Sequence, residues 1–393
     1  MKKIVLFLMS HCFTLLQSQH HTLAPIHNNL EAGQRILIVS DSWNQIGGAE
    51  SVIDQIKMRL EKNNHTVFHL DFSQVRTFKV HFWPNIKSPN PFGLKRTIAQ
   101  KITAFKPDIV IITFLGMLSY IAGQYCSENN IPFTVFYPSR IPEICKAHLN
   151  MPLRISYYFV KNLLSKASRI LVPTQSLKED LQQRGIKNVS VWTHGVDLDV
   201  FKIASHEEKN TALRACNLLD KPRPFYLYVG RLSRAKNIQA FLDSKLPGTK
   251  ILVGPQDYGY YLDDLKQKYP DIVFPGPKSV SELVCYYQCA DIFLFPSKTD
   301  SFGLVQLEAL ASGAPVVAFD ATGPRDVAPR GCGVSYLAKS DQELQKLALK
   351  AWEDRKEGLV TALQCRNHVQ RFSWDSAIDE LLHIAPRAHF VTA

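Results

Sequence analysis

The sequence predicts an α/β protein built from two Rossmann-like, doubly wound domains. Short apolar runs alternate with amphipathic segments, a pattern typical of parallel sheets that are covered by helices on both faces. The alternation ends near residue 192 and begins again at Pro224. The length of 393 residues fits two domains of ordinary size.

The first half of the chain contains both kinds of segment in turn. Continuous apolar runs predict buried strands, and apolar residues recurring every three or four positions predict helices. The strands are expected at 36–39, 66–70, 108–113, 133–136, 169–172 and 189–192. The helices are expected at 49–63, 95–105, 119–129, 153–166 and 176–184.

The second half repeats the pattern after a polar stretch, 205–214, that is expected to be a linker. Its strands are expected at 225–229, 250–253, 272–274, 292–295 and 316–319, and its helices at 237–242, 260–268, 281–289, 304–312 and 342–354. Ligands of such folds bind beyond the carboxyl ends of the strands. Two facing sheets would therefore frame one interdomain cleft.

The chain is expected to divide into an N-terminal extension (1–34), two domains (35–196 and 197–372) and a C-terminal helix and tail (373–393). Lys2 and Lys3 precede an interrupted apolar stretch, which is a weak signal-peptide pattern without a clear cleavage site. A non-structural extension is the favoured interpretation. No apolar run is long enough to predict a transmembrane helix.

Positive charge is concentrated in the first half. Residues 1–199 carry 22 Lys and Arg against 13 Asp and Glu, and the remainder carries 24 against 22. This basic half leaves a membrane surface, a nucleic acid, a phosphorylated ligand and simple solubility as alternatives. Nucleic acid is the weakest of them, because the basic residues form no arm, motif or aromatic platform.

The eight cysteines are scattered and form no CxxC pair, which indicates a reducing compartment. Cys285 and Cys289 lie four residues apart and share one face of a predicted helix. A metal or redox pair is one alternative there, and buried apolar thiols are the favoured one.

Two loops after predicted strands carry residues suited to an anionic ligand. Gly47 and Gly48 open the first helix, where the backbone can approach a ligand and free amides favour an anion. They do not form GxGxxG, so a nicotinamide site is not supported. Arg231 and Lys236 follow the strand at 225–229, and their fork and point charge suit diphosphate. A tight turn and a solvated basic loop are the bland alternatives.

A third loop is the most specific. The strand at 292–295 is followed by Asp300, a glycine turn and a helix that contains Glu308. Acids eight residues apart can reach one bound ligand, and carboxylates suit sugar and ribose hydroxyls. Backbone amides at the start of that helix, near Phe302, can bind phosphate.

The segment 296–317 resembles the E-x7-E signature of retaining glycosyltransferases of the GT-B type, family 4. Arg231 and Lys236 match the family's diphosphate pair, and Gly47 and Gly48 match its N-domain glycine loop. The segments 193–201 and 371–374 resemble its GVDxxxF and FSW motifs. Those at 142–143, 171–174, 191–192 and 322–327 resemble bacterial lipid-directed mannosyl- and glucosyltransferases.

The resemblance covers residue 35 to the C-terminus, and it implies a GT-B fold in which 373–393 crosses back to the N-terminal domain. It also implies that Glu308 holds the ribose hydroxyls of a nucleotide-diphospho-sugar and that Asp300 holds the sugar hydroxyls. Arg231 and Lys236 would neutralise the departing diphosphate, so no metal and no other cofactor would be needed. The remaining nucleotide-binding positions would be Gly254, Ser301, Phe302, Gly303 and Leu304.

The sequence departs from the family pattern at two positions. Asp300 stands where the signature has Glu, and Pro138 stands where the family has a sugar-contacting His. Arg140 is the candidate substitute donor, and reduced activity is the alternative. The stretch 197–199 mimics a DxD metal motif, but its place in the GVDxxxF segment predicts a structural turn, and no metal site is assigned.

The leading hypothesis is a retaining glycosyltransferase that moves a hexose, mannose or glucose, to a lipid or glycan acceptor. A nucleotide-sugar epimerase and a weakly active, membrane-tethered binding protein are the alternatives. Arg154, Lys161 and Lys166 border aromatic residues in the helix at 153–166, which is expected either to lie on an anionic membrane or to pack into the N-terminal core. The resemblance favours the membrane, and hence a cytoplasmic protein that is peripheral on the inner face of the cell membrane.

Overall fold

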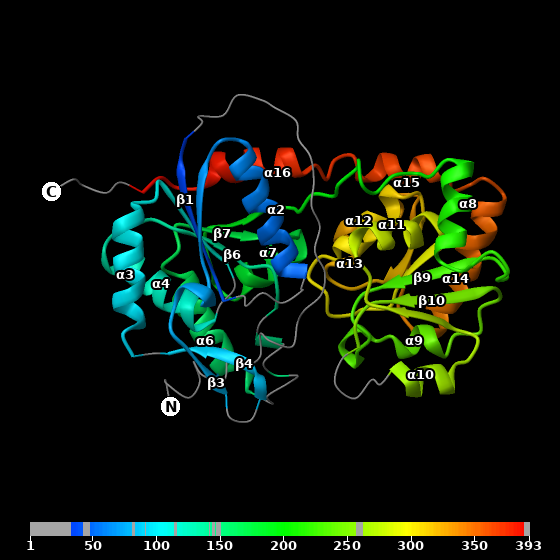
Figure 1. The fold of residues 1–393 in the computed structure, drawn as a ribbon, viewed down its shortest axis with the longest axis horizontal. Helices are drawn as coiled ribbons and strands as arrows, with labels where there is room; N and C mark the ends of the chain where they lie inside the picture. Colours follow the sequence, from blue (N-terminus) through cyan, green and yellow to red (C-terminus); the bar gives the residue numbers. More distant parts are fainter. Residues whose placement is uncertain are drawn as a thin grey trace. The chain divides into compact units, whose positions relative to one another are not determined.

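The computed structural model describes residues 33–41, 48–80, 83–90, 92–113, 116–140, 142–143, 146, 151–256 and 262–388 (Figure 1). Within these residues the chain forms two compact units. The N-terminal unit contains 33–193 and 375–388, and the C-terminal unit contains 194–374. Gly47 and the signal-peptide pattern lie outside the described residues.

The N-terminal unit is built on a six-stranded parallel sheet with helices on both faces (Figure 1). The strand order is β2-β1-β5-β6-β7-β8, so the chain moves outward from β1 and then returns to the other side of β1. The strands are β1 (Arg35–Ser40), β2 (Thr66–Leu70), β5 (Ile109–Thr113), β6 (Thr134–Phe136), β7 (Arg169–Val172) and β8 (Val189–Val191). The helices are α2 (Gly48–Lys62), α3 (Leu94–Phe105), α4 (Met117–Glu128), α6 (Leu153–Leu164), α7 (Gln175–Gln183) and, from its second residue, α16 (Trp374–Ile384).

The C-terminal unit repeats this design with the order β11-β10-β9-β12-β13-β14, again parallel throughout. Its strands are β9 (Phe225–Val229), β10 (Thr249–Val253), β11 (Val273–Gly276), β12 (Ile292–Phe295), β13 (Val316–Phe319) and β14 (Ser335–Ala338). Its helices are α8 (His206–Ala215), α9 (Gln239–Leu242), α10 (Leu262–Lys268), α11 (Val280–Cys289), α12 (Leu304–Ala311), α13 (Pro324–Val327), α14 (Asp341–Lys356) and α15 (Ala362–Val369). The two doubly wound domains predicted from the sequence are confirmed.

The central strands are buried on both faces. Every residue of β5 and of β9 is buried, and so is every residue of β12 and β13. A parallel strand covered by helices on both sides has no polar face, so it reads as a continuous apolar run. This is why the sequence located these strands to within a residue.

The polar stretch expected to be a linker is helix α8, so that expectation is wrong. Ser205 and Glu208 form a capping box at its start, and Ala212 is buried where α8 packs on α11. The other residues of the helix are exposed or only partly buried, which accounts for its polar composition.

An antiparallel hairpin of β3 (Thr77–Val80) and β4 (Trp83–Pro89) was also not expected. Pro84 and Pro89 interrupt the strand pattern there, because proline cannot donate a backbone hydrogen bond. The short elements β14, α13 and α15 were missed as well.

Helix α6 buries the apolar face that was a candidate for membrane contact. Phe159, Leu163 and Leu164 belong to the core of the N-terminal unit, so a membrane role for these three is wrong. On the other side of the helix, Ile155 is 42% exposed and Tyr158 is 59% exposed. Only this narrower face remains available to a partner.

Helix α16 packs on the N-terminal unit. The indole N–H of Trp192 donates to the carbonyl of Ala377 at 2.7 Å, and the N–H of Ala388 donates to the carbonyl of Asp108 at 2.8 Å. The helix begins at Trp374, the last residue of the FSW-like segment. The chain therefore passes between the units twice, after Thr193 and after Trp374.

Candidate functional site

Two loops of the C-terminal unit lie where its strand order reverses. β9 pairs with β10 on one side and with β12 on the other, and the chain runs outward through β10 and β11 before it returns to β12. Ligands of doubly wound sheets bind at such a switch point. The loop after β9 carries Arg231 and Lys236, and the loop after β12 carries Asp300. The topology thus brings these predicted residues to one edge of the sheet.

Lys236 and Asp300 contact each other directly. The Nζ atom of Lys236 donates a hydrogen bond to Oδ1 of Asp300. Only 24% and 19% of the two side-chain surfaces are exposed, so the pair is largely shielded from water. Lys236 ends the one-turn 3-10 helix Arg234–Lys236. The structure therefore joins the cation expected for phosphate to the acid expected for sugar.

The backbone beside Arg231 is tightly held. The hydroxyl of Tyr228 donates to the carbonyl of Arg231 at 2.8 Å. A Cβ atom on Gly254 would lie 2.1 Å from the carbonyl oxygen of Gly230, and Gly254 has φ +145°. A side chain at position 254 would therefore force the ends of β9 and β10 apart. Gly254 has this packing role whatever contact it makes with a ligand.

Helix α12 begins directly after the loop that carries Asp300. Gly303 is its N-cap, with φ 96° and no side-chain cap hydrogen bond. Ser301, Phe302 and Leu304 complete this helix start. The first N–H groups of a helix have no partner within the helix and mark the positive end of its dipole. The start of α12 is therefore suited to a phosphate.

The loop after β13 packs against the backbone of Asp300. A Cβ atom on Gly323 would lie 2.1 Å from the carbonyl oxygen of Asp300, and Gly323 has φ +93°. The N–H of Gly323 donates to Oδ2 of Asp326 at 3.0 Å. The glycine in this family-like segment thus lets the loop pack against the backbone of Asp300.

Glu308 lies in the second turn of α12 and is 8% exposed. The hydroxyl of Tyr287, from α11, donates to its Oε2 atom at 2.6 Å. Burial and the neighbouring carboxylate raise the pKa of Tyr287 well above its ordinary value, so the phenol keeps the proton that it donates. Asp300 therefore lies just before α12 and Glu308 lies in its second turn. Asp300 accepts a hydrogen bond from Lys236, and Glu308 accepts one from Tyr287.

The loop after β1 in the N-terminal unit begins at Asp41, and α2 begins at Gly48. The Asp41 carboxylate accepts backbone N–H groups of Gly116, Leu118 and Ser119 at 2.8 to 3.0 Å, at the start of α4. Burial raises the pKa of Asp41 to about 6. The residue that precedes the glycine loop is thus anchored to a neighbouring helix.

Arg140 lies in an ionic network of the N-terminal unit. Its Nη1 atom is 3.9 Å from Oδ2 of Asp180, and Arg184 lies 3.1 Å from Oδ1 of the same carboxylate. Arg184 also lies 3.9 Å from Glu143. The sequence analysis names Arg140 as the candidate that donates a hydrogen bond to the sugar in place of the usual His. In the structure, Arg140 lies beside the Asp180 carboxylate of its own unit.

Sequence reasoning missed His194. Its ring packs edge-on against Phe302 at a centroid distance of 4.7 Å, and burial lowers the pKa of His194 to about 3. The ring is therefore uncharged at neutral pH and supports the loop before α12 by packing. No local signal in the sequence indicated this contact, and none indicated Tyr287 or the approach of Gly323.

The DxD-like stretch forms a structural turn, as expected. The Oδ1 atom of Asp197 accepts the N–H of Asp199 at 2.8 Å and that of Val200 at 2.9 Å. Among the described residues, no group of three or more His, Cys, Asp or Glu side chains is arranged to hold a metal ion. In the same residues no helix is long and apolar enough to span a membrane.

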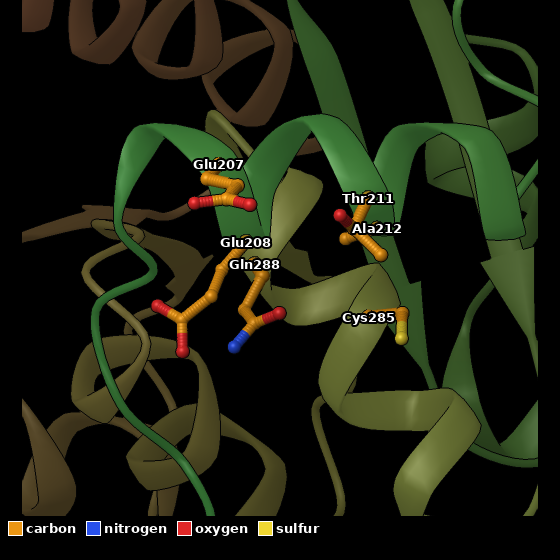
Figure 2. Close-up of a pocket in the computed structure, with 6 residues that line it drawn as sticks. All are labelled: Glu207, Glu208, Thr211, Ala212, Cys285 and Gln288. Atoms are coloured by element: carbon orange, nitrogen blue, oxygen red, sulfur yellow. The ribbon is translucent and has the colours of Figure 1, made fainter.

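A pocket of about 300 Å³ lies between α8 and α11 (Figure 2). Its lining residues are Glu207, Glu208, Thr211, Ala212, Cys285 and Gln288. Cys285 is partly exposed at this pocket, whereas Cys289 is buried, so the expectation of two buried thiols holds for Cys289 alone. None of the predicted site residues lines the pocket.

Two family models match successive parts of the chain. A family model described as Glycosyltransferase Family 4 matches residues 46–200, and one described as Glycosyl transferases group 1 matches residues 209–360. A GDP-mannose-dependent alpha-mannosyltransferase of Mycobacterium tuberculosis is 26% identical over 370 residues, covering 89% of this chain and 96% of the relative. An alpha-monoglucosyldiacylglycerol synthase of Streptococcus pneumoniae is 26% identical over 313 residues, covering 72% and 70%.

Solved structures share the fold. The crystal structure of Anabaena Alr3699/HepE in complex with UDP and glucose has a TM-score of 0.69 and 19% identity. The match covers 89% of this chain and 98% of that one. At this identity the likeness establishes the architecture alone.

Proposed function

Because the chain belongs to the family 4 glycosyltransferases of the GT-B fold, we propose that it moves a hexose from a nucleotide-diphospho-sugar to a lipid or glycan acceptor, with retention of configuration and without a metal ion. Mannose is the first sugar to consider, because a relative covered over 96% of its length is named a GDP-mannose-dependent alpha-mannosyltransferase. Glucose is the second, because another relative is named a glucosyldiacylglycerol synthase.

The observation that carries the proposal is the hydrogen-bonded pair of Lys236 and Asp300 at the sheet's switch point. On the proposed function, a bound diphosphate attracts Lys236, and the released Asp300 carboxylate accepts hydrogen bonds from sugar hydroxyls. Arg231 lies on the same loop as Lys236 and offers a second cation. Positive charge from these two residues and from the start of α12 opposes the negative charge that grows on the leaving group.

In the proposed step, the bond between the anomeric carbon and the diphosphate oxygen breaks, and a bond from the acceptor oxygen to that carbon forms on the same face. The acceptor hydroxyl gives its proton to the departing diphosphate, which leaves as the nucleoside diphosphate. Both carboxylates act as hydrogen-bond acceptors, Asp300 for the sugar and Glu308 for the ribose. No enzyme nucleophile takes part in this scheme.

The proposed metal independence depends on the positive charge at the site. A divalent cation in other glycosyl transfers neutralises the diphosphate, and here Lys236, Arg231 and the α12 start supply positive charge at the corresponding place. Addition of EDTA is therefore expected to leave turnover unchanged.

The acceptor is proposed to be a lipid presented at an anionic membrane. The exposed face of α6 carries Arg154, Ile155, Tyr158 and Lys161, a mixture of basic and apolar side chains suited to a headgroup region. The excess of Lys and Arg in residues 1–199 also favours attraction to an anionic membrane surface. On this proposal the enzyme works as a peripheral protein on the cytoplasmic face of the membrane.

Purified enzyme with a donor panel tests the function. GDP-mannose, UDP-glucose and ADP-glucose are each incubated with vesicles of diacylglycerol and phosphatidylinositol, and the lipid product is analysed by mass spectrometry and by NMR of its anomeric proton. One donor should give an alpha-linked product. Failure of every donor to be bound or consumed contradicts the proposed function, and a beta-linked product contradicts retention.

The acid pair supplies the specific variants. Glu308→Gln and Asp300→Asn keep the side-chain volume but remove charged hydrogen-bond acceptors. Each is therefore expected to lose roughly 1.5–3 kcal/mol of transition-state stabilisation, measured as a fall in kcat/KM. Asp341→Asn is the matched control, because Asp341 pairs with Lys298 at 3.2 Å on the exposed surface. Wild-type kinetics in both acid variants would refute the assignment.

A further inference from the structure

We propose that Tyr287 is a positioning residue that orients the Glu308 carboxylate and thereby sets the preference of the enzyme for ribose over deoxyribose in its nucleotide. The inference rests on the function proposed above, in which Glu308 accepts the ribose hydroxyls. Its structural basis is the 2.6 Å hydrogen bond from the Tyr287 hydroxyl to Oε2 of Glu308, between a tyrosine with no exposed surface and an acid that is 8% exposed.

The ring of Tyr287 is fixed by other aromatic side chains. Phe201 contacts it edge-on with ring centroids 5.5 Å apart, and Phe293 of β12 lies at 5.9 Å. Aromatic rings packed in this way have little rotational freedom at χ1. The hydroxyl of Tyr287 is therefore held in one direction, toward α12.

The GVDxxxF-like segment gains a role through this packing. Phe201 is its last residue, and Asp197 at its centre caps the turn that leads to it. Arg366 of α15 donates to the carbonyls of Phe201 at 3.0 Å and Leu198 at 2.9 Å, and to the carbonyl of Ala311 at the end of α12 at 3.2 Å. One guanidinium thus ties the support of Tyr287 to the helix that carries Glu308.

A flexible glutamate without such a partner can adopt several rotamers, and ordering it costs free energy when the ligand binds. A hydrogen bond from a buried phenol removes that freedom in advance and holds the carboxylate as an acceptor. This ordering strengthens the binding only of ligand groups that donate hydrogen bonds to Glu308. The 2′- and 3′-hydroxyls of ribose are such groups, so removal of Tyr287's hydroxyl should reduce the discrimination between ribose and deoxyribose more than the affinity for the diphosphate.

Calorimetric titration of the full-length protein tests the proposal. The ligands are whichever of GDP, UDP and ADP gives the largest thermal stabilisation, and its 2′-deoxy and 3′-deoxy forms. Wild-type protein should bind the ribose form about tenfold more tightly than at least one deoxy form. Tyr287→Phe should reduce that ratio to about twofold or less, with the affinity for the deoxy form unchanged.

Tyr336→Phe is the matched control. Its hydroxyl donates to the Asp354 carboxylate at 2.7 Å, so the control removes a similar hydrogen bond elsewhere in the same unit and should keep the wild-type ratio. Phe201→Leu is a second variant, which loosens the ring of Tyr287 but keeps its hydroxyl, and it should lower the ratio in part. In a Glu308→Gln background, Tyr287→Phe should cause no further change.

A wild-type ratio in Tyr287→Phe overturns the role of Tyr287 and leaves the proposed function standing. If the wild-type protein binds none of the three diphosphates, the proposed function fails and this inference fails with it. If Tyr287→Phe does not fold, a wild-type ratio in Phe201→Leu overturns the inference.

Discussion

The ammonium group of Lys236 and the carboxylate of Asp300 are hydrogen-bonded to each other across the two loops that follow β9 and β12. They are 64 residues apart in the chain and come from neighbouring strands of one parallel sheet. A pair of this kind places a cation and an acid together before any substrate is present. On the proposed function, the pair would link the binding of a phosphate to the release of the Asp300 carboxylate, because one ammonium group cannot serve both anions fully.

Removal of either cation should slow turnover more than it weakens donor binding. Lys236→Ala and Arg231→Ala each delete a charge that, on the proposed function, stabilises the departing diphosphate, and such losses commonly reduce kcat by about 10²–10³. Steady-state kinetics with the preferred donor separate the two effects. A rise in KM alone, with kcat near wild type, would show that the charges act in ground-state binding. Lys298→Ala, which removes an exposed lysine paired with Asp341, serves as the control.

The sequence alone was enough to locate the strands and the charged residues that follow them. Strands such as β9 and β12 are continuous apolar runs because helices cover both faces, and Arg231, Lys236 and Asp300 follow them directly. Helix α8 was misread because a helix with a narrow buried side looks like a polar linker.

Other features depend on contacts between distant segments, which local patterns do not encode. Tyr287 meets Glu308 only when α11 and α12 pack on the same sheet, and Gly323 meets Asp300 only when the loops after β13 and β12 meet. Helix α6 was ambiguous for another reason. A basic helix with one aromatic side has the same pattern whether that side enters a membrane or, as for Phe159 and Leu163, the core of its own domain.

Gly323→Ala should impair donor binding as well as stability. The new Cβ atom would lie 2.1 Å from the carbonyl oxygen of Asp300, so the loop must move away from the site. Gly331→Ala is a close control, because Gly331 has a similar φ of +85° but nothing within 4 Å of the added atom. The control should lose only the roughly 1–2 kcal/mol of left-handed backbone strain. Urea unfolding and donor titration of both variants should show a change in donor affinity for Gly323→Ala alone, and equal affinities would contradict the role of Gly323.

Asp41 should make the stability of the N-terminal unit depend on pH. Its folded-state pKa of about 6 lies above the ordinary value of 3.8, so the folded state binds more protons between these limits. The contribution is therefore fully present below about pH 4 and is lost as the pH rises through 6. The difference corresponds to about 3 kcal/mol.

Urea unfolding at pH 4.5 and pH 7.5 measures this effect. Asp41→Asn should flatten the pH dependence relative to wild type, although it should also be less stable at both values, since an amide nitrogen cannot accept the N–H groups at the start of α4. Thr174→Ala removes a helix cap in the same unit, where Thr174 accepts the N–H of Leu177 at 3.3 Å, and should keep the wild-type slope because threonine does not titrate. An unchanged slope in Asp41→Asn would exclude Asp41 as the titrating group.

The exposed face of α6 should bind anionic membranes if the acceptor is a lipid. Each basic residue near such a surface contributes about 1 kcal/mol, so reversing the charge of Arg154 and Lys161 should reduce vesicle affinity more than tenfold. Co-sedimentation with vesicles of increasing phosphatidylglycerol content measures this, and binding should fall as salt is raised.

Lys245→Glu/Lys346→Glu makes the same charge change at exposed positions of the C-terminal unit and should have a smaller effect. Ile155→Ser/Tyr158→Ser should weaken binding without altering its dependence on salt, because it removes apolar insertion and keeps the charge. If wild-type protein stays in the supernatant at low salt, the acceptor is a soluble glycan and the basic surface serves solubility alone.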